Sequence, residues 1–309
     1  MDNYTSTVVG NTTTERLAYP FLYEINDTII LEARRYGGSF ANGAPYRTYY
    51  KSTNDGQSFG DMNEYITYGD TDYWMYKIQV RNNLSAKDTA ILAIMPSNVD
   101  LGYNVFQYIT YLKTDFTGDF YALDGTNLGS NVTGTELETY ASWGDTTKNQ
   151  NLYYLQGSKL FGNDIYAIGY IGTMPTSTPN VTYMQIIKTN INTGVVTMGS
   201  AFAHKFSSDV MVGIVLFNIC DDIYAKMVVN NTIYYYQINQ DLNDMTLVYT
   251  ETGTYARQIP TDFYNELTAD YDYGTKTLRI FRMSDPDTVW DLTTEQPATT
   301  EEVTTTSGG

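Results

Sequence analysis

The chain has 309 residues, enough for one large all-β domain or two ordinary ones. Its net charge of −17 repels phosphate backbones and anionic lipid surfaces, which excludes direct nucleic-acid binding and attraction to such a membrane surface. Aromatic residues make up 15% of the chain, 30 residues are Tyr, and only 17% of the residues are charged. This composition favours half-buried strands whose outer edges are exposed to solvent.

The ends of the chain and its cysteine content indicate where it is made. The first residues contain neither a basic region nor an apolar run, so we expect a protein made in the cytoplasm without a signal peptide. No apolar window of about 18 residues exists, which predicts no membrane insertion. The single cysteine, Cys220, excludes an intrachain disulfide and is predicted to be a buried structural thiol in an apolar strand.

Taken in order, the chain begins with a polar, Thr-rich arm over residues 1–15. From Tyr19 onward the apolar residues follow a period of two, which predicts strands, the first two at 28–33 and 46–51. No segment shows a 3.6-residue stripe over three turns. The best helix candidate is the short segment 261–267, so we expect almost no helix.

A phrase made of a turn and a strand recurs along the chain. It is present at 26–30, 87–92, 163–167 and 221–225, with a degenerate copy at 272–280. Its aspartates stand 61, 76 and 58 residues apart: Asp27, Asp88, Asp164 and Asp222. A second phrase follows about 25 residues later, at 50–56, 112–118 and 187–194, and more weakly at 237–243. Each copy ends a strand in a polar turn where Asn, Asp and Gly accept positive φ.

Repeats of this length that hold about four short strands are typical of β-propeller blades. We therefore predict an all-β propeller over residues 16–292 with about five four-stranded blades, or six if one copy has been missed. The alternative is a β-sandwich with chance similarity among its strands. Residues 293–309 contain almost no apolar residue, which predicts a Thr/Glu-rich flexible tail, a linker, or a segment that orders only on a partner.

The turn at 52–59 resembles the Asp-box, or BNR repeat, of sialidase-like propellers. The matching residues are Ser52, Gly56, Ser58 and Phe59, with Asn54 in place of the aspartate. The resemblance implies a structural turn between the third and fourth strands of a blade. In this turn the Asn54 side chain would cap its own backbone, Gly56 would supply positive φ, and Phe59 would pack under the edge.

The resemblance covers about 45 residues, from Ala18-Tyr19-Pro20 through Glu32-Ala33-Arg34 to the Asp-box turn. It implies an arginine two residues before the proline, where this chain has Ala18; Arg16 lies two residues further away. It also implies an acid/base aspartate in the loop before the Asp-box strand, but residues 36–46 contain no Asp or Glu, and Asn42 is the nearest analogue. Because an amide cannot transfer a proton as a carboxyl can, we predict no sialidase chemistry.

The single histidine excludes a multi-histidine metal site. His204 is predicted to be a strand residue with one ring nitrogen in a hydrogen bond. The alternative is the general base of a propeller-type polysaccharide lyase, with Arg257 or Arg279 holding the uronate carboxylate. Acidic pairs lie at predicted turns, so we expect no metal site and no cofactor. The candidate ligand-binding residues are Arg34, Arg35, Asn42, Arg47, His204, Arg257 and Arg279.

These observations predict a propeller without catalytic activity, which acts as a structural or attachment component of a virus particle or a similar large assembly. Bacteriophage tail and capsid proteins offer the analogy. The expected partners are other subunits of the assembly and a surface glycan, which the exposed Tyr and Trp residues, among them Trp74 and Trp143, would suit. The alternative is a divergent polysaccharide lyase or glycosidase on the same fold.

Overall fold

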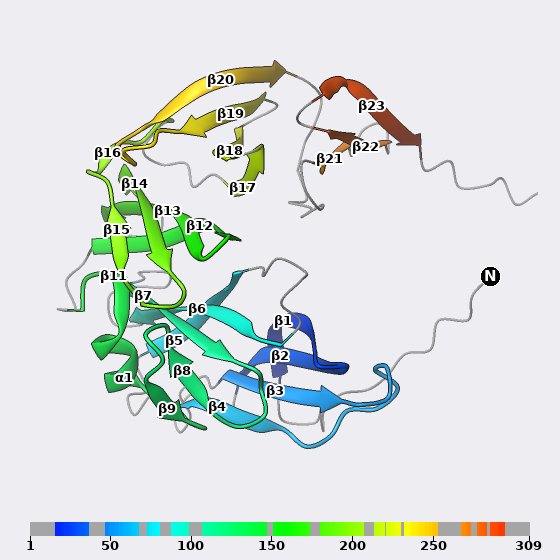
Figure 1. Ribbon diagram of the computed structural model, residues 1–309, viewed down its shortest axis with the longest axis vertical. Helices are drawn as coiled ribbons and strands as arrows, with labels where there is room; N and C mark the ends of the chain where they lie inside the picture. The colour runs from blue at the N-terminus through cyan, green and yellow to red at the C-terminus, as the bar shows by residue number, and fades with distance from the viewer. Residues whose placement is uncertain are drawn as a thin grey trace, which may run out of the picture.

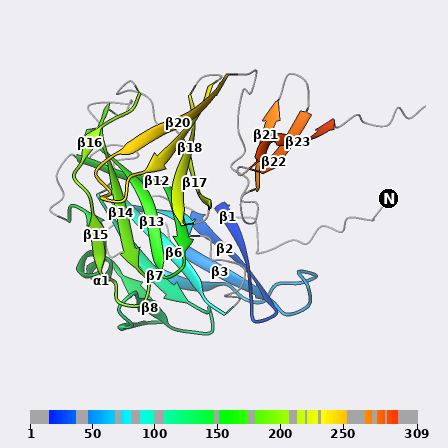
Figure 2. The same ribbon diagram turned by 45° about the horizontal axis from the view of Figure 1, so that its top comes forward.

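The protein is an all-β propeller (Figure 1). The computed structural model describes residues 16–36, 47–67, 73–80, 88–98, 107–146, 151–173, 180–206, 213–219, 221–229, 232–252, 267–272, 277–282 and 285–293. Over these residues the strands form five sheets, named A to E in chain order, that follow one another around a common centre and are antiparallel except for one short parallel pairing in sheet A. Figure 2 shows the same separation of the sheets from a second direction, so the sandwich alternative was wrong. The number of blades stays a prediction.

Sheets A and B contain the first half of the chain. Sheet A consists of β1 (Arg16–Ile25), β2 (Thr28–Tyr36), β3 (Arg47–Ser52), β4 (Asn63–Thr67) and β10 (Val132–Thr133). Sheet B consists of β5 (Tyr73–Val80), β6 (Ala90–Asn98), β7 (Tyr108–Thr114), β8 (Phe120–Ala122), β9 (Asn127–Gly129) and β11 (Ala141–Gly144).

The second half of the chain forms sheets C, D and E. Sheet C consists of β12 (Asn151–Phe161), β13 (Asp164–Thr173), β14 (Asn180–Asn190), β15 (Val196–Met198) and β16 (Phe202–Ala203). Sheet D consists of β17 (Ile214–Ile219), β18 (Asp222–Val229), β19 (Thr232–Ile238) and β20 (Met245–Thr252). Sheet E consists of β21 (Leu267–Asp272), β22 (Thr277–Arg282) and β23 (Asp285–Thr293).

Both repeated phrases occupy equivalent places in these sheets. The first phrase forms the turn between the first two strands of sheets A and C, at Asn26 and Asp27 and at Gly162 and Asn163, and it begins the second strand of sheets B and D. The second phrase ends the third strand, at β3, β7, β14 and β19. The prediction that the two phrases belong to adjacent strands of a repeated sheet is confirmed. In sheets A to D the first phrase leads into the second strand, the second phrase ends the third strand, and these two strands are hydrogen-bonded to each other.

The residues with positive φ in these turns only partly follow the prediction. Asp55, Gly56 and Gly194 have φ of 56°, 78° and 69°, as turn-forming residues should. In the other two turns Phe116 and Leu242 take φ of 57° and 62°. The left-handed region costs a residue with a Cβ about 1–2 kcal/mol. Both side chains are buried in the core, and burying such a side chain contributes about 1.5–3 kcal/mol, which offsets the strain.

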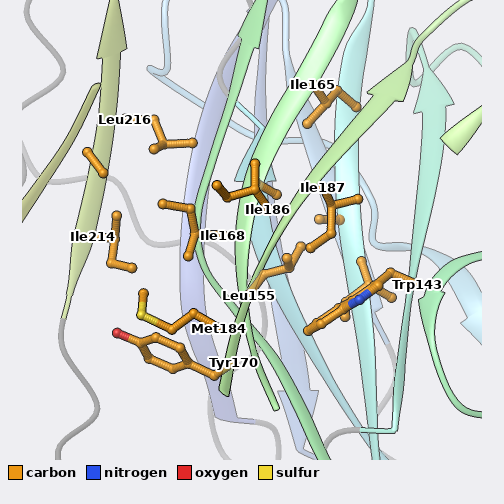
Figure 3. Packing of buried hydrophobic residues seen from close by; sticks show 14 of the residues in the cluster. Trp143, Leu155, Ile165, Ile168, Tyr170, Met184, Ile186, Ile187, Ile214 and Leu216 are labelled. Atoms are coloured by element: carbon orange, nitrogen blue, oxygen red, sulfur yellow. The ribbon is translucent and has the colours of Figure 1, made fainter. Parts of the chain in front are cut away.

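The core lies between neighbouring sheets, and sheet B is covered on both faces. Strand β6 shows this clearly: Ile91, Ala93 and Met95 belong to a cluster shared with sheets C and D. The alternate residues Ala90, Leu92 and Ile94 belong to a second cluster shared with sheet A. Side chains alternate between the two faces of a strand, so a strand buried on both faces reads as an unbroken apolar run. Figure 3 shows the first cluster, with Leu155, Ile168 and Met184 packed between Trp143 and the side chains of β17.

One short helix interrupts the strands in the part of the chain that the structure describes. Helix α1 (Gly134–Thr139) begins with a capping box in which the Thr133 hydroxyl accepts from the Glu136 N–H and the Glu136 side chain accepts from the Thr133 N–H. The pattern Thr-x-x-Glu is a sequence signal for this start, and the prediction overlooked it. The sequence analysis favoured a helix at 261–267 instead. Its last residue was assigned wrongly, because Leu267 begins β21. Residues 261–266 lie outside the described residues. Residues 1–15, the tail beyond Thr293 and Cys220 also lie outside them.

Candidate functional site

The strand directions divide every sheet into two ends. In sheet A the turns after β1 and β3 lie at one end, which we call the turn end. Strand β2 runs from there toward Tyr36, and β3 returns from Arg47, so the connection over residues 37–46 leaves from the opposite end, the loop end. The candidate residues Arg34, Arg35 and Arg47 therefore lie at the loop end of sheet A.

Strand register places the predicted arginines in one row. Arg34 lies directly opposite Arg47 on β3 and directly opposite Ala18 on β1. Ala18 is the position at which the sialidase resemblance implies an arginine. Directly opposed residues in an antiparallel pair share a face of the sheet, so Arg34 and Arg47 are close neighbours.

Glu32 contacts both Arg47 and a tyrosine. Arg47 donates from Nε to Glu32 Oε1 at 2.7 Å, and its Nη2 forms an ion pair with the same oxygen at 2.5 Å. The Tyr65 hydroxyl donates to that oxygen at 2.7 Å. The exposed fraction of the residue is 0% for Glu32, Arg47 and Tyr65 and 1% for Arg34. We name these four residues the sheet A cluster.

Charge and burial in this cluster act together on the proton affinities. Burial alone lowers the pKa of Arg47, but the Glu32 carboxylate and Tyr65 more than offset it, so the pKa lies above its ordinary value. Burial and the Glu32 charge raise the pKa of Tyr65 well above its ordinary value, with a smaller opposing effect of Arg47. Tyr65 therefore keeps its proton and donates its hydrogen bond to Glu32.

The sheet A cluster packs against sheet B. Tyr65 stacks on Phe120 with ring centroids 4.5 Å apart and the planes 6° from parallel. Tyr49, which lies opposite Glu32, meets Phe116 edge-on at 5.0 Å. Strand β10 reinforces the contact: it leaves the β8–β9 region and pairs in parallel with β4. The cluster thus joins the first two sheets, and neither guanidinium faces solvent.

The pairing of Tyr65 with Glu32 is the feature that the sequence prediction did not find. Tyrosine is abundant, and the two residues are 33 positions apart, so no local signal singles them out. A tyrosine beside a glutamate could in principle act as an activated nucleophile. A nucleophilic phenolate needs a lowered pKa, whereas burial and the Glu32 charge raise the pKa of this one. The geometry therefore supports a structural role for the pair.

The turn at 52–59 has the internal hydrogen bonds expected of it. Asn54 Oδ1 accepts from the Ser52 hydroxyl at 2.9 Å and from the Ser58 N–H at 3.0 Å. Gly56 N–H donates to the Ser52 hydroxyl at 2.9 Å, and Phe59 is half-buried. The prediction that Asn54 caps its own turn between β3 and β4 is confirmed. The assignment of the turn to the Asp-box stays an interpretation.

His204 follows β16 at the rim of sheet C, near the loop end. Its backbone N–H donates to Thr182 O at 3.1 Å, which extends the pairing with β14. Its Nδ1 lies 3.2 Å from the Phe206 N and 3.1 Å from the Phe206 O. The ring meets Tyr170 edge-on at 5.2 Å. One ring nitrogen of His204 is thus hydrogen-bonded to the backbone, as predicted, but the residue lies just after the strand and not in it.

The remaining candidates are dispersed or undescribed. Arg35 and Arg279 lie on β2 and β22, but only their backbone is described. Asn42 and Arg257 lie outside the described residues. The structure therefore brings Arg34 and Arg47 together and places His204 in a different sheet. Among the described residues no group of three His, Cys, Asp or Glu side chains could hold a metal ion, and no helix has the length and apolar character to cross a membrane.

Comparison with known proteins supports the fold and leaves the activity open. No protein-family model and no curated protein matches the sequence. The solved structure of the polysaccharide lyase Uly1 is similar, with a TM-score of 0.53, 13% identity and coverage of 86% of this chain and 55% of that one. The sialidase of Trypanosoma rangeli in complex with DANA gives a TM-score of 0.50 at 9% identity, covering 90% of this chain and 48% of that one.

These similar proteins are glycan-active enzymes on a propeller fold, and this chain spans about half of their length. At such low identity the likeness concerns the fold alone. The sialidase-like propeller that the sequence predicted is therefore supported as an architecture. The active residues of those enzymes cannot be transferred to this chain by the likeness.

Proposed function

We propose that the protein is a propeller without catalytic activity that acts as a structural or attachment component of a virus particle or a similar large assembly. The observation that carries this proposal is the outer strand of sheet D. On β20 three successive apolar residues are exposed: Leu247 (49%), Val248 (49%) and Tyr249 (53%). Within the described chain β20 pairs only with β19, so its outer edge has no strand partner.

An edge strand of this kind invites pairing with another chain. Proteins that remain monomeric usually protect such an edge with Lys, Pro or a covering element. The β20 sequence, MTLVYTET, contains neither Lys nor Pro. Exposed apolar patches of this kind commonly mark interaction surfaces. A neighbouring subunit that covered β20 would bury the apolar side chains and satisfy the edge hydrogen bonds.

The double substitution Leu247→Lys/Val248→Lys should reduce recovery of the protein in large assemblies by about tenfold or more, because charged side chains would replace apolar ones at the contact. Its free energy of unfolding should change by less than about 1 kcal/mol, since both side chains are exposed. Sedimentation of the assemblies formed in the producing cells measures the first quantity and urea denaturation the second. Leu22→Lys, an exposed apolar position on β1, is the matched control. Unchanged recovery would contradict the proposal.

The sequence supports the lack of sialidase activity. Ala18 stands where the resemblance implies a carboxylate-binding arginine, and residues 37–46 contain no Asp or Glu. The neighbouring Arg47 is occupied by Glu32. We expect no hydrolysis of a fluorogenic sialoside above the rate of the buffer. Hydrolysis that survives both Asn42→Ala and His204→Ala would show that an active site exists elsewhere in the molecule.

The second candidate is a divergent polysaccharide lyase. The observation that favours it is the contact of His204 with Tyr170, since a histidine and a tyrosine can supply the base and the acid of an elimination. His204 Nε2 has no hydrogen-bond partner among the described residues. If this candidate is correct, a uronate polymer should gain ultraviolet absorbance on incubation with the protein, and His204→Ala should remove at least about 99% of the rate. Absence of any absorbance change leaves the binding role as the better account.

A further inference from the structure

A small pocket of about 170 Å³ lies between sheets B and C. One wall comes from sheet B: Leu123 and Asp124 in the β8–β9 turn, and Tyr140 and Ser142 around the start of β11. The other wall comes from the β14–β15 turn of sheet C, at Thr193 and Gly194. Pockets that enclose drug-sized ligands measure about 300–1,000 Å³, so this one has room for a single small ring.

The walls are held in place by backbone contacts. Gly194 has φ of +69°, and a Cβ built on it would lie 3.4 Å from the Asp124 backbone nitrogen. The two sheets therefore touch closely at this point. Asp124 Oδ1 accepts from the Thr126 N–H at 2.9 Å, and the Gly194 N–H donates to Asn190 O at 2.9 Å. Both turns are thus fixed by their own hydrogen bonds, which leaves the pocket preformed.

The chemistry of the lining selects among ligand classes. Among the described residues Asp124 is the charged residue of the lining, and neither Lys nor Arg contributes to it, so an anionic ligand is disfavoured. Hydrogen bonds from Thr126 keep the pKa of Asp124 below its ordinary value, so it is ionised at neutral pH. Tyr140, Ser142 and Thr193 add hydroxyl groups, which can both donate and accept. An ammonium group offers only donors, whereas a sugar hydroxyl can use both functions.

Apolar surface completes the pocket. Ala122, Leu123 and Val196 line it beside the half-buried ring of Tyr140. The hydroxyl-bearing side chains of Tyr140 and Ser142 line the same pocket and can donate to or accept from a ligand. Apolar walls with a few polar groups that fix orientation are the usual design of a small-molecule site.

We propose that this pocket binds one uncharged pyranose ring of a glycan. The Asp124 carboxylate accepts from neighbouring sugar hydroxyls, Ser142 and Thr193 exchange hydrogen bonds with the others, and the apolar walls cover the C–H face of the ring. Such a site would serve the attachment role proposed above. It does not depend on that role, because the isolated chain would bind the sugar without joining an assembly.

The test is titration of the purified full chain with glucose, galactose, mannose and N-acetylglucosamine, followed by saturation-transfer NMR. At least one of these sugars should bind, and Asp124→Asn should weaken its binding about tenfold or more, since a neutral amide oxygen then replaces a charged hydrogen-bond acceptor. Tyr140→Ala should also weaken it.

The chain offers a matched control in the same sheet. Asp115 Oδ1 accepts from the Thr117 N–H at 2.8 Å, the same turn geometry as Asp124 and Thr126, but it does not line the pocket. Asp115→Asn should therefore leave sugar binding within about twofold of the original protein. Three results would overturn the proposal: no neutral sugar binds, the two asparagine variants weaken binding equally, or glucuronate or N-acetylneuraminic acid binds more tightly than every neutral sugar. Recovery in assemblies is a separate measurement, so failure here does not decide the proposed function.

Discussion

Replacement of Glu32 by Gln should lower the free energy of unfolding by about 3–5 kcal/mol, because it leaves a buried positive charge without its partner. Gln has nearly the same shape, so the change removes charge and leaves packing almost intact. Arg47 makes both its Nε hydrogen bond and its ion pair to the same Glu32 oxygen, and both side chains are fully buried. Urea denaturation followed by tryptophan fluorescence measures the loss.

Two further variants make this result specific to the cluster. Tyr65→Phe should cost about 1.5–3 kcal/mol, the usual value for a hydrogen bond to a charged group. In the double variant Glu32→Gln/Tyr65→Phe the two losses should add to more than the measured total, because the hydroxyl has then lost its charged acceptor. Glu24→Gln on the exposed side of β1 is the control and should cost less than about 1 kcal/mol. A loss for Glu32→Gln as small as this control would show that the buried ion pair contributes little.

Trp143→Ala should lower the free energy of unfolding by about 3–5 kcal/mol, the range for removing a large buried aromatic side chain. The expectation that Trp143 is exposed was wrong: the residue is 6% exposed and meets Tyr153 edge-on at 5.4 Å. Its indole lies directly over Gly169 of sheet C, where an added Cβ would come within 2.6 Å of indole Cζ2. Figure 3 shows the indole among the apolar side chains of the shared cluster. Removal of the ring leaves a cavity between sheets B and C, which thermal and urea denaturation would both detect.

A second substitution at Trp143 separates the contribution of the indole N–H from that of the apolar ring. Trp143 Nε1 donates to Gln185 Oε1 at 2.8 Å, and Gln185 Nε2 donates to Gly199 O at 2.8 Å. Trp143→Phe retains most of the apolar volume and should cost clearly less than Trp143→Ala. Tyr121→Ala, a partly exposed aromatic residue of sheet B, should cost less than about 1 kcal/mol. If Trp143→Ala were no worse than Tyr121→Ala, the indole could not be a core element of the junction between sheets B and C.

The hairpins of this protein could be predicted from the sequence because they depend on neighbouring residues. Alternation of apolar side chains defines a strand, and Asn, Asp and Gly define the turns that reverse it. Asn26 and Asp27, for example, form the turn that β1 and β2 share. Repetition of these local units at similar spacing was sufficient to predict the propeller, since repeated sheets of this kind bury their faces against one another.

Asn54 shows that a single turn residue also depends on its neighbours in the sequence. Its side chain caps atoms two and four positions away, so the turn chemistry was visible in the sequence. The capping box of α1 was equally local, and its signal was present at Thr133 and Glu136. That helix was overlooked because six residues are too few to show a helical period.

Contacts between sheets were decided only by the tertiary structure. Tyr65 and Glu32 are 33 positions apart in the sequence, and Trp143 and Gln185 are 42 positions apart. The residues next to Glu32 do not indicate which of the 30 tyrosines will contact it, and the residues next to Trp143 do not indicate its polar partner. Packing also reversed a local preference at Phe116, where burial stabilises a backbone conformation that the residue would otherwise avoid. Arg34 and Arg47 were candidates for ligand binding by type and position; only the tertiary structure shows that both are buried and that Arg47 is paired with a carboxylate. Local sequence therefore determined the strands and turns, and long-range packing determined which side chains meet, because its free energy depends on surfaces that exist only after the sheets assemble.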